Sequence, residues 1–367
     1  MNILIFSPLG GYNGAEVFLK NLVRHLPEDI DVAFYFEKKN GLSEELSGSF
    51  KVFYPLSEVS TFWRLIGRLA DLALSYNLER RRILRIHRNF KADAWYINTL
   101  NLPKIAFLAK SSGIRYIVHL HELTSMYSRM PAREMDLMIT NALLVIGCSE
   151  EVSKNASILG AKQVETFYEV IDFEPIKVAA SRKVGRKSFG LPEWGFLWVA
   201  SGAPDYRKGV DYIPAIAKAV GGRGSILWLG HGNSGLKFFV ERQLVAMGLS
   251  NVVFMGERHD DYYEILNLAD GFILTSREDP FPLVMIEAAA LGKPIVSFNS
   301  GGVSEFLKEG MGIIVANHDI NAFISAMSQV MNRSVVFTSS KSIQRARNFD
   351  ASLKTMDWLK IVQNYLR

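Results

Sequence analysis

The sequence predicts an α/β protein of two doubly wound domains, each built on a parallel sheet. Its 367 residues exceed one ordinary domain and suit two of roughly 150–200 residues. Short apolar runs rich in β-favouring residues alternate with helical patterns, and the alternation restarts after residue 195. This order favours parallel strands joined by crossover helices on both faces. We expect domains at residues 1–172 and 173–349, followed by a terminal segment 350–367.

Each element is expected from local periodicity. An apolar stripe at residues 18, 19, 22, 23 and 26 predicts a helix after the first strand, and apolar positions 353, 356, 359, 362 and 366 predict a terminal helix that crosses back to the first domain. The expected strands of the first half are 2–7, 32–36, 52–54, 95–97, 116–119 and 143–146. Those of the second half are 197–200, 226–229, 252–255, 271–274, 295–298 and 312–315, with helices at 209–220, 236–247, 261–268, 281–291 and 320–331.

Composition narrows the class of protein. With 49% apolar and 22% charged residues the chain can form large cores. Its single cysteine, Cys148, excludes an intramolecular disulfide and a cysteine-based metal cluster. No run of about 18 apolar residues occurs, and the first residues, MNILIFSPLGG, predict a strand and not a signal peptide. We therefore expect a cytoplasmic protein.

Positive charge is concentrated in one stretch. The net charge is +5, but residues 51–115 hold 12 Lys/Arg against 4 Asp/Glu, or +8, which leaves −3 for the remainder. A basic helix at 79–91 (ERRRILRIHRNFK), with Trp63, Leu65 and Ile66 upstream, suggests that residues 57–91 rest on an anionic membrane at its inner face. A solvated helix face is an equally good interpretation. Nucleic acid is not an expected partner, because acid-lined α/β clefts offer no basic groove.

The most informative segment is the acidic turn between a strand and a helix, REDPFPLVMIEAAALGKP at 277–294. It places Glu278, Asp279 and Glu287 near one another. Carboxylates bind sugar hydroxyls through charge-assisted hydrogen bonds. The N–H groups and positive end of the following helix suit a phosphate. One segment thus offers contacts for both a sugar and an anion.

Two other turns complement it. In SGAPDYRKG (201–209), Arg207 and Lys208 open a helix and suit a diphosphate, although a solvated Arg–Lys pair is the plainer interpretation. Gly10 and Gly11 follow the first strand and would let the backbone approach a ligand, or simply form a tight turn. Their spacing fails the dinucleotide-binding fingerprint.

Two histidines end a strand in the first half. His119 and His121, in VHLHEL, share a face if the strand persists that far. Beside an acid they could move protons or form hydrogen bonds, or they could be structural. Two histidines at this spacing with one acid lack a full zinc ligand set, so we expect no metal site.

Together these motifs resemble a known enzyme family. Asp279-x7-Glu287 resembles the E-x7-E motif of the retaining glycosyltransferases of family 4, whose GT-B fold has two Rossmann-like domains facing a central cleft. RKG at 207–209 is similar to that family's phosphate-binding turn. GAE at 14–16, HE at 121–122, CSE at 148–150 and SGG at 300–302 follow in family-like order. The resemblance covers most of the chain and is strongest at 197–315.

The resemblance implies transfer of a sugar, with retained anomeric configuration, from a UDP- or GDP-linked donor to a glycan or lipid-linked saccharide. It implies no cofactor and no obligatory metal, and a place in surface polysaccharide or lipopolysaccharide-type biosynthesis. The implied catalytic residues are His121, Asp279 and Lys208. The implied donor-binding residues are Gly10, Gly11, Arg207, Lys208, Glu278, Asp279, Phe281, Pro282, Leu283, Glu287 and Arg258.

The resemblance also gives each position a role. Glu287 would bind the ribose and Asp279 the donor sugar, with help from the backbone of residues 281–283. Lys208 would hold the diphosphate, which is electrostatic catalysis of its departure. His121 would lie near the reacting carbon, the Gly10–Gly11 loop beside the diphosphate and acceptor, and the base near 256–258.

Two departures from the family pattern leave alternatives open. Asp279 stands where Glu is usual, so Glu278 could contact the sugar instead. Ala203 stands where an arginine is common, so Arg207 could supply that charge or one phosphate contact could be missing. A non-catalytic nucleotide-sugar-binding partner protein therefore remains an alternative. A GT-B-type nucleotide-sugar epimerase fits less well, because the spacing of the acids and the RKG turn suit transferases better.

Overall fold

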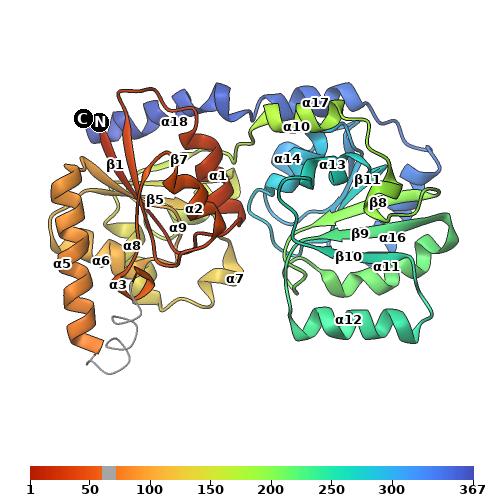
Figure 1. The fold of residues 1–367 in the computed structure, drawn as a ribbon, viewed down its shortest axis with the longest axis horizontal. Helices are drawn as coiled ribbons and strands as arrows, with labels where there is room; N and C mark the ends of the chain where they lie inside the picture. The colour runs from red at the N-terminus through yellow and green to blue at the C-terminus, as the bar shows by residue number, and fades with distance from the viewer. Residues whose placement is uncertain (60–71) are drawn as a thin grey trace. The chain divides into compact units, whose positions relative to one another are not determined.

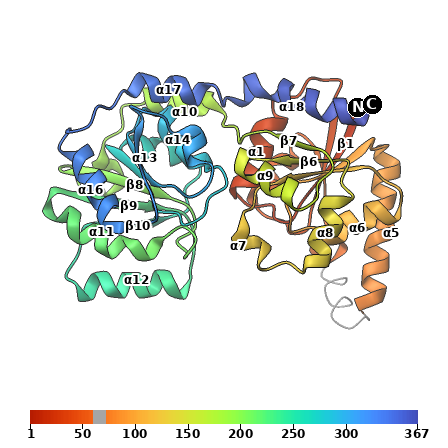
Figure 2. The same cartoon turned by 180° about the vertical axis from the view of Figure 1, so that it is seen from behind.

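The computed structural model describes residues 1–59 and 72–367, which form two compact units. One unit is Met1–Val170 with Ala351–Arg367, and the other is Ile171–Asp350. Each unit contains one parallel sheet with helices on both faces (Figure 1, Figure 2). The predicted α/β class with two doubly wound sheets is confirmed.

The first unit has a seven-stranded sheet in the order β3-β2-β1-β4-β5-β6-β7. Its strands are β1 (Asn2–Ser7), β2 (Asp31–Phe36), β3 (Lys51–Phe53), β4 (Ala94–Ile97), β5 (Tyr116–Leu120), β6 (Leu144–Gly147) and β7 (Val164–Thr166). Its helices are α1 (Gly14–Val23), α2 (Gly41–Ser47), α3 (Leu56–Val59), α5 (Leu72–Phe90), α6 (Pro103–Ser111), α7 (Thr124–Tyr127), α8 (Ala132–Thr140), α9 (Glu150–Ile158) and α18 (Ala351–Leu366).

The second unit has a six-stranded sheet in the order β10-β9-β8-β11-β12-β13. Its strands are β8 (Phe196–Ser201), β9 (Gly224–Leu229), β10 (Val252–Gly256), β11 (Gly271–Leu274), β12 (Ile295–Phe298) and β13 (Gly312–Val315). Its α-helices are α10 (Phe173–Ser181), α11 (Ile213–Val220), α12 (Gly235–Ala246), α13 (Tyr262–Asn267), α14 (Leu283–Ala290), α15 (Val303–Phe306), α16 (Ile320–Met331) and α17 (Ser339–Arg347).

Parallel pairing places the motifs of each unit at one edge of its sheet. All ladders are parallel, so the carboxyl ends of the strands share an edge. The strand order reverses at β1/β4 and again at β8/β11, and such switch points are where open α/β sheets bind ligands. The fold therefore positions the turns after β1 and β5 in one unit, and after β8 and β11 in the other, at candidate binding edges.

The expected helix at 209–220 begins instead with a 3-10 turn, Val210–Tyr212, and the α-helix α11 starts at Ile213. Three other features differ from the sequence-based expectations. Strand β7 was not expected, because its sequence, VET, is half-buried and carries no apolar run. Helix α17, SSKSIQRAR, was also missed, since it has too few apolar residues for a periodic stripe. Helix α14 begins at Leu283 and not at Phe281. Proline disfavours helical backbone in the residue before it, so Pro282 opposes a helical conformation at Phe281 and the helix starts after the proline.

The terminal helix α18 belongs to the first unit. Thr355 Oγ1 donates a hydrogen bond to Leu22 O of α1 over 3.1 Å. Trp358 is fully buried, and its Nε1 donates to Tyr96 Oη over 3.0 Å. The expected amphipathic helix is thus fixed to the sheet by one buried indole. None of the described helices combines the length and apolarity that a bilayer crossing requires.

We expect Trp358→Ala to destabilise the first unit by about 3–5 kcal/mol, because it leaves a large cavity and removes the hydrogen bond that the indole donates to Tyr96. Met356 on the same helix is 46% exposed, so Met356→Ala is a matched control expected within about 0.5 kcal/mol of wild type. Urea unfolding followed by circular dichroism measures both. Equal losses would contradict the proposed anchoring role of the indole.

Candidate functional site

The turn after β8 is held against the turn after β11. Thr275 Oγ1 donates to Lys208 O over 2.7 Å, and Arg277 N donates to Arg207 O over 2.8 Å. Gly209 has φ +73°, and a Cβ there would lie 2.1 Å from Thr275 O, so only glycine permits this approach. Two segments some 70 residues apart in sequence thus form one rigid structure.

Arg277 strengthens this contact from the other side. Its guanidinium makes two hydrogen bonds to the Asp211 carboxylate, at 2.8 and 2.7 Å. It also lies over two rings, 3.8 Å from the centroid of Tyr206 and 4.3 Å from that of Tyr212. A planar guanidinium makes both kinds of contact at once, and lysine does not. Arg277 therefore fixes the turn that carries Arg207 and Lys208.

Lys208 and Asp279 form a buried ion pair, with Lys208 Nζ 2.5 Å from Asp279 Oδ2. Ser276 Oγ donates to the same oxygen over 3.2 Å. Burial alone would raise the pKa of Asp279, but the Lys208 ammonium outweighs it and lowers that pKa below its ordinary value. The structure thus brings together two of the predicted residues as a charged pair.

Asp279 forms an isolated parallel bridge with Gly301, in the loop after β12. Asp279 N donates to Ser300 O over 2.5 Å, and Gly302 N donates to Pro280 O over 3.0 Å. Phe281 packs on Phe306 and Phe349. The side chain of Phe281 is therefore part of the core, and only its backbone is suited to the donor contact expected there.

Glu287 is buried in α14, where two tyrosines hold it. Tyr262 Oη donates to its Oε2 over 3.1 Å, and Tyr263 Oη donates to its Oε1 over 3.0 Å. Burial raises the pKa of Glu287 to about 7, and these hydrogen bonds, which lower it, do not offset burial. Close to neutral pH this acid is therefore poised between its protonated and charged forms.

The remaining predicted residues of this unit belong neither to the Lys208–Asp279 pair nor to the Glu287 cluster. Arg207 Nη1 donates to Glu278 O over 3.2 Å. Arg258 follows β10 and makes two hydrogen bonds to Asp261. Pro282 and Leu283 are buried at the start of α14, and Glu278 is half-buried. Arg207 thus lies against the acidic turn, while the charge of Arg258 is locally neutralised.

In the first unit, the Gly10–Gly11 loop packs against the start of α2. Gly10 N donates to Lys38 O, and Ser43 N donates to Gly10 O, each over 3.0 Å. A Cβ on Gly10 would lie 2.3 Å from Ser43 Oγ. Close backbone packing alone therefore accounts for glycine at position 10, and Gly11 adjoins it.

His121 lies at the carboxyl end of β5 between two acceptors. Its Nδ1 is 2.6 Å from Glu169 Oε1, and its Nε2 is 2.9 Å from Asn98 Oδ1. The Asn98 amide nitrogen donates to Ala15 O, so its oxygen must face the ring. Two acceptors require a proton on both ring nitrogens. Burial would lower the pKa of His121, but the Glu169 carboxylate outweighs it and raises that pKa.

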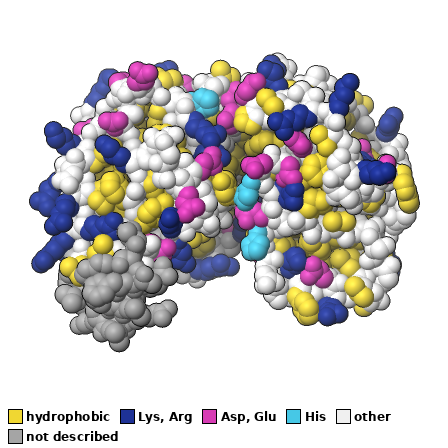
Figure 3. Space-filling model, in the orientation of Figure 1, with side chains coloured by type: hydrophobic (Ala, Val, Ile, Leu, Met, Phe, Trp, Pro, Cys, Tyr) yellow, Lys and Arg dark blue, Asp and Glu magenta, His cyan; other side chains and the backbone are white. Residues whose placement is uncertain are grey.

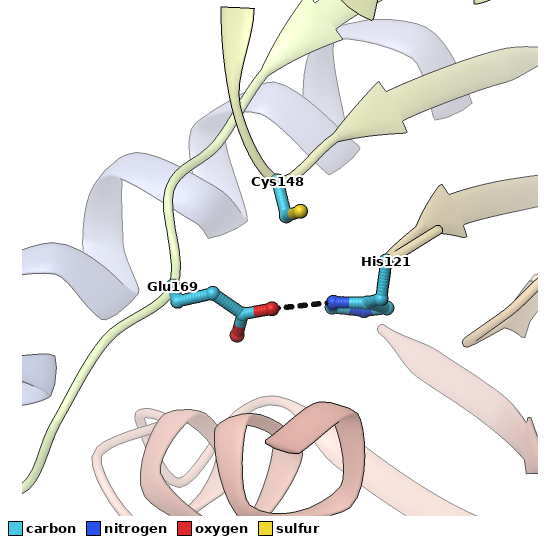
Figure 4. A group of neighbouring side chains, drawn as sticks. All are labelled: His121, Cys148 and Glu169. Carbon is cyan, nitrogen blue, oxygen red and sulfur yellow. Dashed lines mark hydrogen bonds and ion pairs between the residues drawn. The ribbon is translucent and has the colours of Figure 1, made fainter. Parts of the chain in front are cut away.

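Cys148 lies beside this pair, as Figure 4 shows. The ligand atoms of His121, Cys148 and Glu169 all lie within 4.8 Å of one another, which makes them a possible metal-binding group. A metal ion would need a lone pair from a ring nitrogen of His121, and both nitrogens face oxygen acceptors. A protonated histidine fits this arrangement better than a metal ligand does.

The neighbouring buried groups have different protonation. His119 Nδ1 is 2.6 Å from Tyr96 Oη, and burial holds the pKa of His119 well below its ordinary value. Burial raises the pKa of Glu122, although the N–H groups of Leu100 and His121 donate to it. Burial likewise raises the pKa of Glu16 to about 7. His119 is therefore a neutral core residue, whereas His121 carries charge.

Several of these partners could not be identified from the sequence. Glu169 follows β7, a strand that the apolar pattern did not reveal. Asn98 follows β4 and carried no motif, although its position at a strand end was a usable signal. Tyr262 and Tyr263 reach Glu287 from a separate helix.

Comparison with known proteins supports one family. Residues 195–333 match the family model Glycosyl transferases group 1. Over 213 residues the chain is 25% identical to D-inositol 3-phosphate glycosyltransferase of Mycolicibacterium smegmatis, covering 56% of this chain and 49% of that one. Over 142 residues it is 30% identical to O-antigen chain mannosyltransferase C of Escherichia coli, covering 37% of each. The chain thus spans half or less of these curated relatives.

Solved structures match along the whole chain. Anabaena HepE in complex with UDP and glucose has a TM-score of 0.81 at 18% identity, covering 99% of this chain and all of that one. Sucrose-phosphate synthase from Thermosynechococcus elongatus has a TM-score of 0.76 at 15% identity, covering 99% of each. At these identities the likeness shows the fold, which is GT-B.

We expect Glu287→Gln to remove a pH-dependent loss of stability. The pKa of Glu287 is about 7 in the folded state against an ordinary 4.5. Its contribution is therefore fully present below pH 4.5 and lost as the pH rises to about 7, by on the order of 3 kcal/mol. Urea unfolding at pH 4.5 and pH 8 should show the variant gaining on wild type by that amount.

Glu257→Gln in the same unit is the control, since this carboxylate is 45% exposed. It should change stability little at either pH. A difference between wild type and Glu287→Gln that stays constant from pH 4.5 to pH 8 would contradict the expectation.

Proposed function

We propose that the protein is a retaining glycosyltransferase, because residues 195–333 match the Glycosyl transferases group 1 family and the chain has the GT-B fold. It transfers a sugar from a nucleotide-sugar to a glycan or lipid-linked saccharide. The observation that carries the proposal is the junction of the two turns, where Lys208 and Asp279 meet at the carboxyl edge of the sheet. Both residues occupy positions of the family motifs.

The Lys208 ammonium is proposed to bind the donor's diphosphate. As the bond from the sugar to the diphosphate breaks, negative charge grows on the leaving phosphate, and a cation held in place stabilises it more than it stabilises the intact donor. Asp279 then exchanges its pairing with Lys208 for hydrogen bonds to the sugar hydroxyls. The two hydrogen bonds from Arg277 to Asp211 hold the turn that carries Lys208 in place during the reaction.

His121 is proposed to contact the donor sugar by exchanging one of its two ring N–H hydrogen bonds, to Glu169 or to Asn98, for one to a sugar hydroxyl. A doubly protonated ring has no lone pair, so it cannot act as a general base while Glu169 and Asn98 hold it. The positive charge of the ring would attract the negatively charged oxygens of a departing diphosphate. Glu169 and Asn98 act through His121 and are positioning residues.

The comparisons favour particular donors and acceptors. HepE was solved with UDP and with UDP-glucose, which supports a uridine diphosphate sugar as the donor. An O-antigen chain mannosyltransferase among the relatives supports a surface glycan acceptor. A GDP-linked donor is the other donor that we propose to test. We place the reaction in the cytoplasm at the inner face of the membrane and propose no obligatory metal ion.

A non-catalytic nucleotide-sugar-binding protein is the second candidate. Ala203 leaves one position of the phosphate site uncharged, and Arg207, the nearest replacement in sequence, bonds to the Glu278 carbonyl. Loss of a charge-assisted hydrogen bond costs about 1.5–3 kcal/mol, which lowers activity without abolishing it. Donor binding without hydrolysis or transfer would favour this candidate.

We expect the correct nucleotide to raise the melting temperature of the protein and Lys208→Ala to remove the effect. The screen compares UDP, GDP, ADP and their common sugar conjugates. A ligand at 100 times its Kd adds about 2.7 kcal/mol, or roughly 5–10 °C for a unit of this size. Selective stabilisation would identify the base and the donors to test for transfer.

Lys208→Ala leaves Asp279 buried without its cation and will itself reduce stability. The ligand-induced shift, and not the starting melting temperature, is therefore the readout. The double variant Lys208→Ala, Asp279→Asn restores charge balance and should still show no shift. A shift of wild-type size in both variants would remove Lys208 from the donor site.

We also expect Glu287→Ala to weaken nucleotide binding more than Glu278→Ala does. Glu287 occupies the second acid position of the motif and is assigned to the ribose, whereas Glu278 is adjacent to the first. Removing a charge-assisted contact should cost about 1.5–3 kcal/mol, roughly 10- to 100-fold in Kd. Calorimetric titration measures the Kd of the nucleotide for both variants. Equal effects would mean that Glu287 is not the acid that binds the ribose.

A further inference from the structure

A groove of about 690 Å³ lies in the first unit between the edge strand β3 and helix α5. This volume falls within the range of sites for small organic ligands. The groove is formed by the described part of the basic stretch that the sequence singles out, whereas the predicted contact by Trp63, Leu65 and Ile66 lies outside the described residues.

Helical and strand periodicities explain why these side chains converge. Leu78, Arg82, Arg85 and Asn89 recur at intervals of three or four residues, so they share one face of α5. On β3, Lys51 and a second lining residue two positions later share one face of the strand. The two faces meet, and the groove runs between them.

The charged groups that line the groove are all cations. Lys51, Arg81, Arg82 and Arg85 line it, and no acidic side chain does so among the described residues. Glu79, the nearest acid of α5, instead accepts hydrogen bonds from Tyr35 Oη and Leu56 N. Figure 3 shows Lys and Arg side chains gathered over α5.

One of these cations has a hydrogen-bond donor without an acceptor among the described residues. Arg82 Nη1 is buried and has no hydrogen-bond partner among the described residues. Within the part of the chain that the structure describes, none of the four cations forms an ion pair. Buried guanidinium N–H groups are normally paired, so an anionic oxygen in the groove would satisfy a donor that the fold leaves open.

Apart from the amide of Asn89, the remainder of the lining is apolar. Phe53, Leu56, Leu78, Ile86 and Phe90 form it. Lys51 Nζ lies 5.5 Å from the centroid of Phe90, so a charge and an apolar surface adjoin directly. An occupant that matches both must combine an anionic head with a hydrocarbon chain.

We infer that this groove binds a single anionic phospholipid from a bilayer, with its phosphate among Lys51, Arg81, Arg82 and Arg85 and one acyl chain along the apolar lining. The inference deepens the membrane contact of the proposed function and rests on it for the location, but not on the transfer reaction. It differs from general attraction to a charged surface because it requires a chain to enter the groove.

The test uses the full-length protein and lipids below their critical micelle concentration. Calorimetry compares dihexanoyl phosphatidylglycerol, dibutanoyl phosphatidylglycerol, dihexanoyl phosphatidylcholine and glycerol 3-phosphate. Each buried methylene should raise affinity about fourfold, so dihexanoyl phosphatidylglycerol should bind most tightly. Equal binding of glycerol 3-phosphate would show an anion site without a lipid and overturn the inference.

Two variants distinguish binding of the lipid headgroup from binding of its acyl chain. Arg81→Gln with Arg85→Gln should weaken binding to phosphatidylglycerol vesicles about 25-fold, at roughly fivefold for each charge. Lys354→Gln with Lys360→Gln on α18 removes the same charge from exposed positions and should have little effect. Leu78→Gln preserves helix propensity and should abolish the dependence on chain length.

Two further results would overturn the inference. One is equal affinity of the wild-type protein for dihexanoyl and dibutanoyl phosphatidylglycerol, which would indicate attraction by charge alone. The other is equal weakening by the α5 and α18 double variants. Transfer to a water-soluble acceptor, measured in parallel, should be unchanged in the α5 variant, so failure of the groove and failure of the enzyme are distinguishable.

Discussion

The candidate site of the second unit depends on the buried ion pair between Lys208 and Asp279. Removing an ammonium and a carboxylate from water is unfavourable, and the pair is stable only when both turns hold their side chains in contact. The Thr275 hydroxyl and the Arg277 guanidinium provide this constraint, because each joins the β8 turn to the β11 turn. Under the proposed function, the donor's diphosphate would meet a cation whose position has already been fixed, which is the arrangement that electrostatic catalysis requires.

The first unit solves a different electrostatic problem. Glu16, Glu122 and Glu169 are all buried around one strand edge, and like charges close together in a poorly hydrated interior cannot all ionise. The unit accommodates them by keeping a charged His121 in contact with Glu169 and by raising the pKa of the other two acids. The second unit thus holds a buried cation beside one carboxylate, whereas the first holds a protonated histidine between two acceptors.

Sequence reasoning succeeded wherever one segment carried its own signal. Buried parallel strands are continuous apolar runs, so twelve of the strands were expected, and the turns after β8 and β11 were recognised because cations and acids stand at strand ends. Sequence reasoning failed where a residue's role depends on a side chain that is distant in sequence. Nothing near Glu169 indicates that it will face His121, and nothing in α14 indicates that Tyr262 and Tyr263 will bury Glu287. The start of α14 was wrong for a local reason, since Pro282 opposes a helical conformation at Phe281.

The cations of the basic groove have two competing explanations, protection of an edge strand and binding of a ligand. Strand β3 is the edge of its sheet, and edge strands commonly carry a lysine that discourages pairing with another chain. Lys51 fits that role. Edge protection does not account for three arginines on the facing helix, nor for a buried guanidinium nitrogen of Arg82 without a partner. Both features bring unfavourable repulsion and desolvation to the folded chain, and an anion lying between strand and helix would offset each of them.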